Sequence, residues 1–251
     1  MSRLIDTSVF CGHWPFRNLS PRDPAGLRRH LSSRGVDRAW VAAAEAVLFP
    51  DPMEANEPLF TAIAGDEFFI PLAIVNVTLP QFMADAAACV ERWKCRGFKL
   101  LPNYHQYSLS DARVQKLLQF CADANAPVCI QLRMMDERAH HPLMLTPGVA
   151  AAEVTALAEK FPRNRFLACG AYTSELKALK AGNLWVELSS VESGDALGNA
   201  LKHIAADRIV FGSHSPFYYF EAEAAKLNVG NDIPAGTLEK IAEKNAVALL
   251  G

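Results

Sequence analysis

Eight short apolar segments, each followed by a segment suited to a helix, constrain the fold of this chain more than any other feature. Strands are expected at residues 4–10, 39–44, 69–75, 97–101, 127–132, 165–169, 183–188 and 209–211. Several of these segments are apolar throughout, as strands covered on both faces of a parallel sheet must be. Between them, Val114, Leu117, Leu118 and Cys121 have the spacing of one helical face.

Eight strand–helix units in 251 residues predict an α/β protein, a (β/α)8 TIM barrel, with residues 1–251 as a single domain. An open doubly wound sheet is the alternative. It calls for a glycine-rich phosphate-binding turn after the first strand, and the segment from Asp6 to Phe10 has none. The hydrophobic content of 51% is ample for one large core.

The composition narrows the range of partners and compartments. The 25 basic and 27 acidic residues give a net charge of −2, so we expect neither nucleic acid nor an anionic membrane surface as a partner. No apolar run approaches the ~20 residues of a membrane span. The six scattered cysteines form no Cys-x-x-Cys pair, and no signal peptide is evident, which indicates a cytoplasmic protein with reduced thiols. A homo-oligomer stays open.

The stretch from Ile209 to Phe217 is the strongest candidate for part of a functional site. It begins as an apolar strand and turns at Gly212. We expect Ser215 to cap a helix that has Pro216 at its first position. In a TIM barrel the active site lies at the carboxyl ends of the strands, so we place His214 in it.

The same rule selects further polar side chains at strand ends and in the loops that follow them. Two of them have a structural alternative. Asp6 is either a catalytic group or a cap for backbone N–H groups, and Lys99 is either a cation at the barrel mouth or a partner of Glu187 or Asp6. The predicted substrate-binding residues are Ser8, Lys99, His105, Tyr107, Gln131, Arg133, Arg138 and His141.

Two alternatives concern the rim of the site. Arg133 and Arg138 suit an anion site, because guanidinium groups bind carboxylates in pairs of hydrogen bonds, but one of them is also expected to form an internal salt bridge with Asp136 or Glu137. Several aromatic residues either line an apolar pocket or close the barrel end as a plug: Trp14, Phe16, Phe217, Tyr218 and Tyr219.

Three motifs resemble the amidohydrolase superfamily, in particular its amidohydrolase-2 branch of metal-dependent hydrolases and decarboxylases. They are Leu-Ile-Asp6, Arg-Gly-Phe-Lys-Leu-Leu-Pro102, and the stretch from Ile209 to Phe217 followed by Glu-Lys-Asn-Ala246. The resemblance implies two metal-binding histidines in an Asp-x-His-x-His motif, but Ser8 and Phe10 stand there instead. Other metal-site positions of the family hold Gln131, Cys169-Gly170 and His214.

We therefore expect no cofactor, with a rebuilt zinc site from His105, Asp136, His141 and His214 as the alternative. The first functional hypothesis is a metal-independent hydrolase of a lactone, ester or C–C bond in a small anionic substrate. His214 is its general base and Asp6 orients it or acts as a second base. Two alternatives stay open: a catalytically degenerate barrel that binds a small molecule, and a decarboxylase of an aromatic acid.

Overall fold

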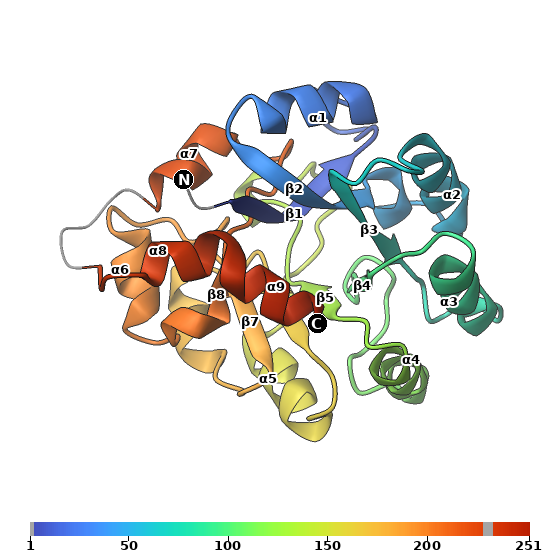
Figure 1. Ribbon diagram of the computed structural model, residues 1–251. Helices are drawn as coiled ribbons and strands as arrows, with labels where there is room; N and C mark the ends of the chain where they lie inside the picture. The colour runs from blue at the N-terminus through green and yellow to red at the C-terminus, as the bar shows by residue number, and fades with distance from the viewer. Residues whose placement is uncertain (1–2, 228–232) are drawn as a thin grey trace.

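The computed structural model describes residues 3–227 and 233–251, and eight parallel strands follow one another in chain order around a barrel (Figure 1). Backbone contacts between β1 and the end of β8 bring the first and last strands together: Thr7 N–H donates to Phe211 O (2.9 Å), and Phe10 N–H to Ser215 O (2.8 Å). The expected (β/α)8 barrel is confirmed. The strands are β1 Leu4–Cys11, β2 Val36–Ala43, β3 Phe69–Ile74, β4 Gly97–Leu100, β5 Val128–Gln131, β6 Phe166–Cys169, β7 Leu184–Glu187 and β8 Ile209–Val210.

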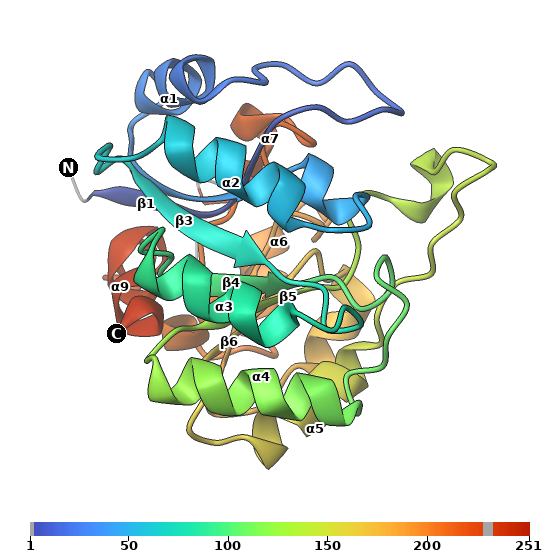
Figure 2. The same cartoon turned by 90° about the vertical axis from the view of Figure 1, so that its right-hand side faces the viewer.

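Helices surround the strands (Figure 2), and no described helix is long and apolar enough to cross a membrane. The residues predicted for one helical face, including Val114 and Leu117, are buried on α4. Asp111 caps α4 by accepting a hydrogen bond from Arg113 N–H. The helices are α1 Pro24–Ser32, α2 Met53–Ala62, α3 Phe82–Glu91, α4 Ala112–Asp123, α5 Ala151–Lys160, α6 Ala196–Leu201, α7 Phe220–Ala225, α8 Thr237–Glu239 and α9 Asn245–Leu250, with a π-helical turn at Lys240–Lys244 between the last two.

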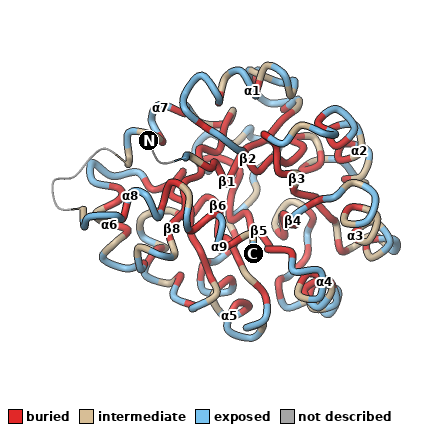
Figure 3. The backbone as a smooth tube through the Cα atoms, viewed as in Figure 1, coloured by how far each residue is buried: buried red, intermediate tan, exposed pale blue. Residues whose placement is uncertain are grey.

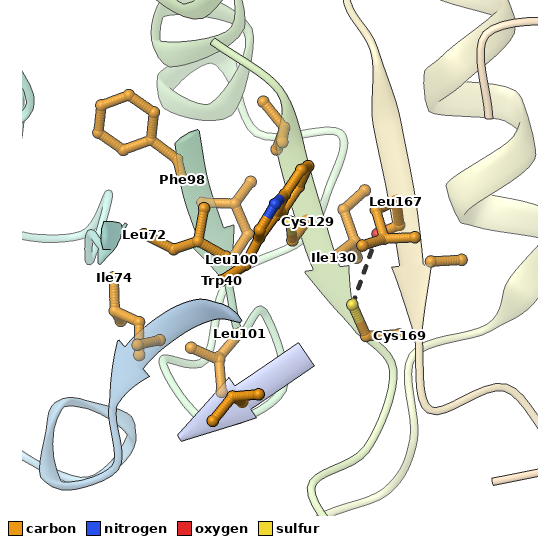
Figure 4. Packing of buried hydrophobic residues seen from close by; sticks show 14 of the residues in the cluster. Trp40, Leu72, Ile74, Phe98, Leu100, Leu101, Cys129, Ile130, Leu167 and Cys169 are labelled. Atoms are coloured by element: carbon orange, nitrogen blue, oxygen red, sulfur yellow. Dashed lines mark hydrogen bonds between the residues drawn. The ribbon is translucent and has the colours of Figure 1, made fainter. Parts of the chain in front are cut away.

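Burial is concentrated on the strands, while the outer faces of the helices are exposed (Figure 3). Figure 4 shows side chains from neighbouring strands, including Trp40, Leu72, Phe98 and Ile130, packed in one apolar cluster. Apolar burial stabilises a fold by roughly 25 cal/mol per Å². The barrel is therefore held by its apolar residues, and the few polar groups inside it require a separate explanation.

The expectation that Ser215 and Pro216 begin a helix is wrong, because α7 begins only at Phe220. The backbone of Ser215 instead forms a parallel bridge with Val9 of β1. Ser215, which was expected to cap a helix, is therefore part of this bridge instead. The bridge also fixes the position of His214, whose φ of 53° lies in the left-handed region.

Candidate active site

Lys99 lies inside the barrel at the carboxyl end, where β4 places it, and is fully buried. Its Nζ donates a hydrogen bond to Gln131 Oε1 (2.7 Å), and Gln131 Nε2 donates to Arg133 O (2.7 Å). The ammonium also lies 4.7 Å from the centre of the Phe10 ring and 3.8 Å from Cys169 Sγ. Lys99 and Gln131 are thus hydrogen-bonded neighbours, although they lie far apart in the sequence.

Asp6 joins β1 to the segment after β8. Its Oδ1 accepts hydrogen bonds from Ser213 N–H (2.9 Å) and Ser8 N–H (3.2 Å), so the capping function is present. Among the described residues, neither Asp6 Oδ2 nor the buried hydroxyl of Ser8 has a partner. Burial raises the pKa of Asp6 to about 7, although these hydrogen bonds oppose the shift. Near neutral pH the carboxyl group is thus available both as an acid and as a base.

Glu187 is the second buried carboxylate of this barrel end, and backbone donors satisfy it. Its oxygens accept hydrogen bonds from Gly170 N–H (2.5 Å), Ser189 N–H (2.5 Å) and Ser189 Oγ (3.0 Å). Burial raises the pKa of Glu187, while these donors and the charge of Lys99 oppose the rise. Its hydrogen bonds therefore connect β7 with the end of β6.

His214 is fixed as a neutral imidazole. Its Nε2 lies 2.7 Å from Met134 O, and because a carbonyl oxygen only accepts, Nε2 carries the proton. Nδ1 then presents a lone pair with no partner among the described residues. Burial, and secondly the charge of Lys99, lower the pKa of His214 to about 3. Any general-base function of His214 would have to use Nδ1 of this weakly basic ring.

Aromatic side chains cover the site. The ring of His214 packs against Phe10, Phe217 and Tyr218, with ring centres 5.0–5.2 Å apart. Trp14 packs in turn on Phe217 at 5.0 Å and is buried. Of the predicted rim residues, Trp14, Phe217 and Tyr218 belong to this cover, whereas Phe16 and Tyr219 are exposed. The side chains beneath it are accessible to a ligand only when part of the cover moves.

His105 and Tyr107 lie in the loop after β4, and their surroundings differ from those of Lys99. His105 Nε2 lies 3.3 Å from Ala46 O, and burial lowers the pKa of this histidine to about 4. Burial raises the pKa of Tyr107, whose hydroxyl has no partner among the described residues. His105 also lines a cavity of about 450 Å³ with Tyr104 and Asn76.

The guanidinium of Arg133 is occupied by internal partners. It forms a two-pronged ion pair with Glu175, with both N–O distances at 2.7 Å, and stacks 3.7 Å from the centre of the Tyr172 ring. Arg138 lies on the surface and pairs with Asp136 at 2.5 Å. The predicted salt bridge with Asp136 therefore exists for Arg138. Arg133 instead has Glu175 as its main partner, which was not predicted, and approaches Glu137 only to 3.9 Å.

His141 is exposed in the long loop after β5. Its ring lies 5.3 Å from that of Phe16, and its Nδ1 accepts a hydrogen bond from Leu143 N–H (3.2 Å). The structure thus brings Asp6, Ser8, Lys99, Gln131 and His214 to one barrel end. The other predicted binding residues lie around this barrel end and outside the group: His105, Tyr107, Arg133, Arg138 and His141. The carbonyl of Met134 and the ring of Phe10 also belong to this end, although no pattern in the sequence indicates them.

Arg133→Lys is expected to lower the free energy of unfolding by about 2 kcal/mol, because an ammonium cannot reproduce the paired hydrogen bonds of a buried guanidinium. Urea denaturation followed by circular dichroism measures this change. The matched control is Arg138→Lys, whose side chain is exposed, and no measurable shift is expected for it. Equal stabilities of the two variants would contradict a structural role for Arg133.

The solved structures that are similar to this chain over nearly its full length include the following three. A 2,6-dihydroxybenzoate decarboxylase in complex with 2,6-dihydroxybenzoate has a TM-score of 0.79 and 16% identity, covering 100% of this chain and 99% of its own. The 5-carboxyvanillate decarboxylase of Sphingomonas paucimobilis has 0.76 and 15%, with the same coverage. A dihydroxybenzoic acid decarboxylase of Polaromonas has 0.74 and 16%, covering 100% and 97%. These likenesses show the fold. No curated protein is found to match the sequence.

The Polaromonas enzyme was crystallised with bound manganese, and this finding contradicts our expectation that this protein uses no cofactor. The side chains found here do not fit such an ion, however. Within residues 3–227 and 233–251 no group of three or more His, Cys, Asp or Glu side chains is arranged to hold a metal. The buried ammonium of Lys99 lies at this barrel end instead, and a second cation beside it would be repelled.

The sequence itself gives the family. The family model described as amidohydrolase, Amidohydro_2, matches residues 23–251, which is most of the chain. This match agrees with the resemblance based on Arg-Gly-Phe-Lys-Leu-Leu-Pro102 and on the stretch from Ile209 to Phe217. The protein belongs to the amidohydrolase family.

Proposed function

We propose that the protein binds a small aromatic carboxylate at the carboxyl end of the barrel and releases its carboxyl group as CO2. The observation that carries this proposal is the pair of groups inside that end: the buried ammonium of Lys99, and Asp6 with its free Oδ2 and a pKa of about 7. The similar structures described above support it, because they are decarboxylases of aromatic acids.

Each group has a defined task in this reaction. Lys99 binds the substrate carboxylate, held in place by its hydrogen bond to Gln131. The bond between the ring carbon and the carboxylate then breaks, its electron pair stays on the ring carbon, and CO2 leaves. Protonated Asp6 transfers its proton to that carbon and later regains one from water. We assign no step to a metal ion, because the described side chains at this end do not fit one.

The hydrolase hypothesis has less support than this alternative. A general base for water works best when its pKa is near the operating pH, and the pKa of His214 is about 3. His214 is instead suited to accept a hydrogen bond at Nδ1 from a hydroxyl group of the ligand. Entry of the ligand would require Phe217 and Tyr218 to move aside from His214.

The test is release of CO2 from a panel that includes 2,6-dihydroxybenzoate and 5-carboxyvanillate, with and without added Mn²⁺. Lys99→Met is expected to lower kcat/KM about 10- to 100-fold, the value of one charge-assisted hydrogen bond. The matched control is Lys202→Met, an exposed lysine at the end of α6, with no expected change. Full activity of Lys99→Met on any accepted acid would overturn the role of Lys99.

A second candidate is a barrel that binds a small molecule without converting it. The lack of a metal-holding group among the described residues favours it, because the similar Polaromonas decarboxylase was crystallised with manganese. A thermal-shift screen of the same acids, run beside the CO2 assay, separates the two functions. If an acid raises the melting temperature but no CO2 is released with or without Mn²⁺, the result would support binding alone.

A further inference from the structure

A cavity of about 360 Å³ lies between the loop after β1, the start of α1, and α2. Figure 2 shows α1 and α2 side by side on this flank of the barrel. Its volume falls in the range of small-molecule sites. Buried apolar side chains form much of its wall, among them Ala43, Ala55 and Leu59. An organic molecule with an apolar part of modest size therefore fits it.

Two carboxylates on the wall are held in place by backbone donors. Glu45 Oε1 accepts a hydrogen bond from His13 N–H (2.6 Å), and Asp23 Oδ1 accepts one from Gly26 N–H (2.8 Å). No described residue donates to the other oxygen of either group. Gly12 makes room for Glu45, because with φ at +128° a Cβ atom at this position would overlap with Glu45 Oε2. Any side chain at position 12 would displace this carboxylate.

The charge on the wall is not balanced internally. Asp23, Glu45 and Glu54 face one basic residue among the lining residues, Arg22. The guanidinium of Arg22 donates hydrogen bonds to Leu19 O and Asn18 Oδ1, and therefore engages this loop instead of a carboxylate. The thiol of Cys11 donates to Arg22 O at 3.2 Å; burial, and then Glu45 and Asp23, raise its pKa to about 12, so it stays neutral.

We propose that this cavity binds a primary amine with a small apolar body, its ammonium held by the carboxylates of Glu45 and Asp23 and its apolar body against Ala55 and Leu59. An ammonium group donates up to three hydrogen bonds, which the two free carboxylate oxygens accept. The fixed carboxylates repel anions. A neutral analogue of the amine can still pack against the apolar wall, but it lacks the ionic interaction with the carboxylates. The site is separate from Asp6 and Lys99.

Isothermal titration calorimetry with benzylamine, benzyl alcohol and benzoate tests this site. Benzylamine is expected to bind at least about 10-fold more tightly than benzyl alcohol. Glu45→Gln, which keeps an oxygen for His13 N–H, is expected to weaken benzylamine binding by a similar factor. Glu57→Gln is the control, since Glu57 lies on α2 near the lining residues Ala55 and Leu59 but does not line the cavity itself.

Ala55→Phe fills the cavity and is expected to abolish benzylamine binding; Glu45→Gln remains decisive if this variant does not fold. Absence of benzylamine binding to the unaltered protein, equal binding of benzyl alcohol, or unchanged binding to Glu45→Gln would each overturn the proposal. Benzoate is expected to bind independently of Glu45. Its failure to bind would count against the proposed function at the barrel end and would leave this cavity unaffected.

Discussion

Glu187→Ala is expected to lower the free energy of unfolding by about 4 kcal/mol. The substitution leaves two buried N–H groups, those of Gly170 and Ser189, without an acceptor, at about 1–3 kcal/mol each. It also opens a void in a packed interior and removes a negative charge near Lys99. For a chain of this size the melting temperature is expected to fall by about 10 °C.

Differential scanning calorimetry and urea denaturation measure this loss. Glu159→Ala is the matched control, because Glu159 is exposed on α5 and its side chain forms no hydrogen bond or ion pair with the described residues. A change below about 1 kcal/mol for Glu187→Ala would show that water replaces the carboxylate at these donors. The contacts of Glu187 would then contribute little to the barrel end.

The barrel was predictable because it depends on patterns that are local in the sequence. The spacing of Val114, Leu117, Leu118 and Cys121 determines one face of α4, and all four side chains are buried there. Eight apolar segments then leave few ways to cover both faces of a parallel sheet. The helix expected at Ser215 failed for the opposite reason: pairing with Val9, from the first strand of the chain, overrides the local capping preference.

The site was predictable in position but not in its internal contacts. The rule that strand ends gather at one rim predicts that Asp6, Lys99 and His214 lie at one barrel end, and the structure places them there, while their functions stay predictions. It cannot say which partner a buried group takes. Arg133 binds Glu175 because β6 ends beside β5. The acidic residues that are close to Arg133 in the sequence, Asp136 and Glu137, were the expected partners instead. Such pairings depend on rotamers and distances that only the assembled barrel defines.

Asp6→Asn is expected to have the largest effect on activity, a loss of kcat in CO2 release on the order of 10²- to 10⁴-fold, because an amide cannot donate the proton. In the unaltered protein kcat is expected to fall as the pH rises above about 7, where Asp6 loses its proton. Asp207→Asn, at an exposed position, is the control and is expected to match the unaltered protein. An unchanged kcat for Asp6→Asn would remove Asp6 from the proposed reaction.

The same substitution has a second readout that does not require a substrate. In the folded protein Asp6 keeps its proton up to a pH of about 7, whereas in the unfolded chain it loses it near the ordinary value of 3.8. Folding therefore binds a proton in this window, and the stability present below pH 3.8 declines as the pH rises towards 7, on the order of 4 kcal/mol in total. The amide of the Asp6→Asn variant cannot titrate but still offers an oxygen to Ser213 N–H.

Urea denaturation of both proteins from about pH 4 to about pH 8 measures this linkage. The stability of Asp6→Asn relative to the unaltered protein is expected to rise across the window and to level off above a pH of about 7. A constant difference would mean that Asp6 has an ordinary pKa and is not the acid proposed here. A rising difference combined with unchanged CO2 release would instead leave Asp6 as a buried cap, costly above neutral pH, which holds β1 to the end of β8.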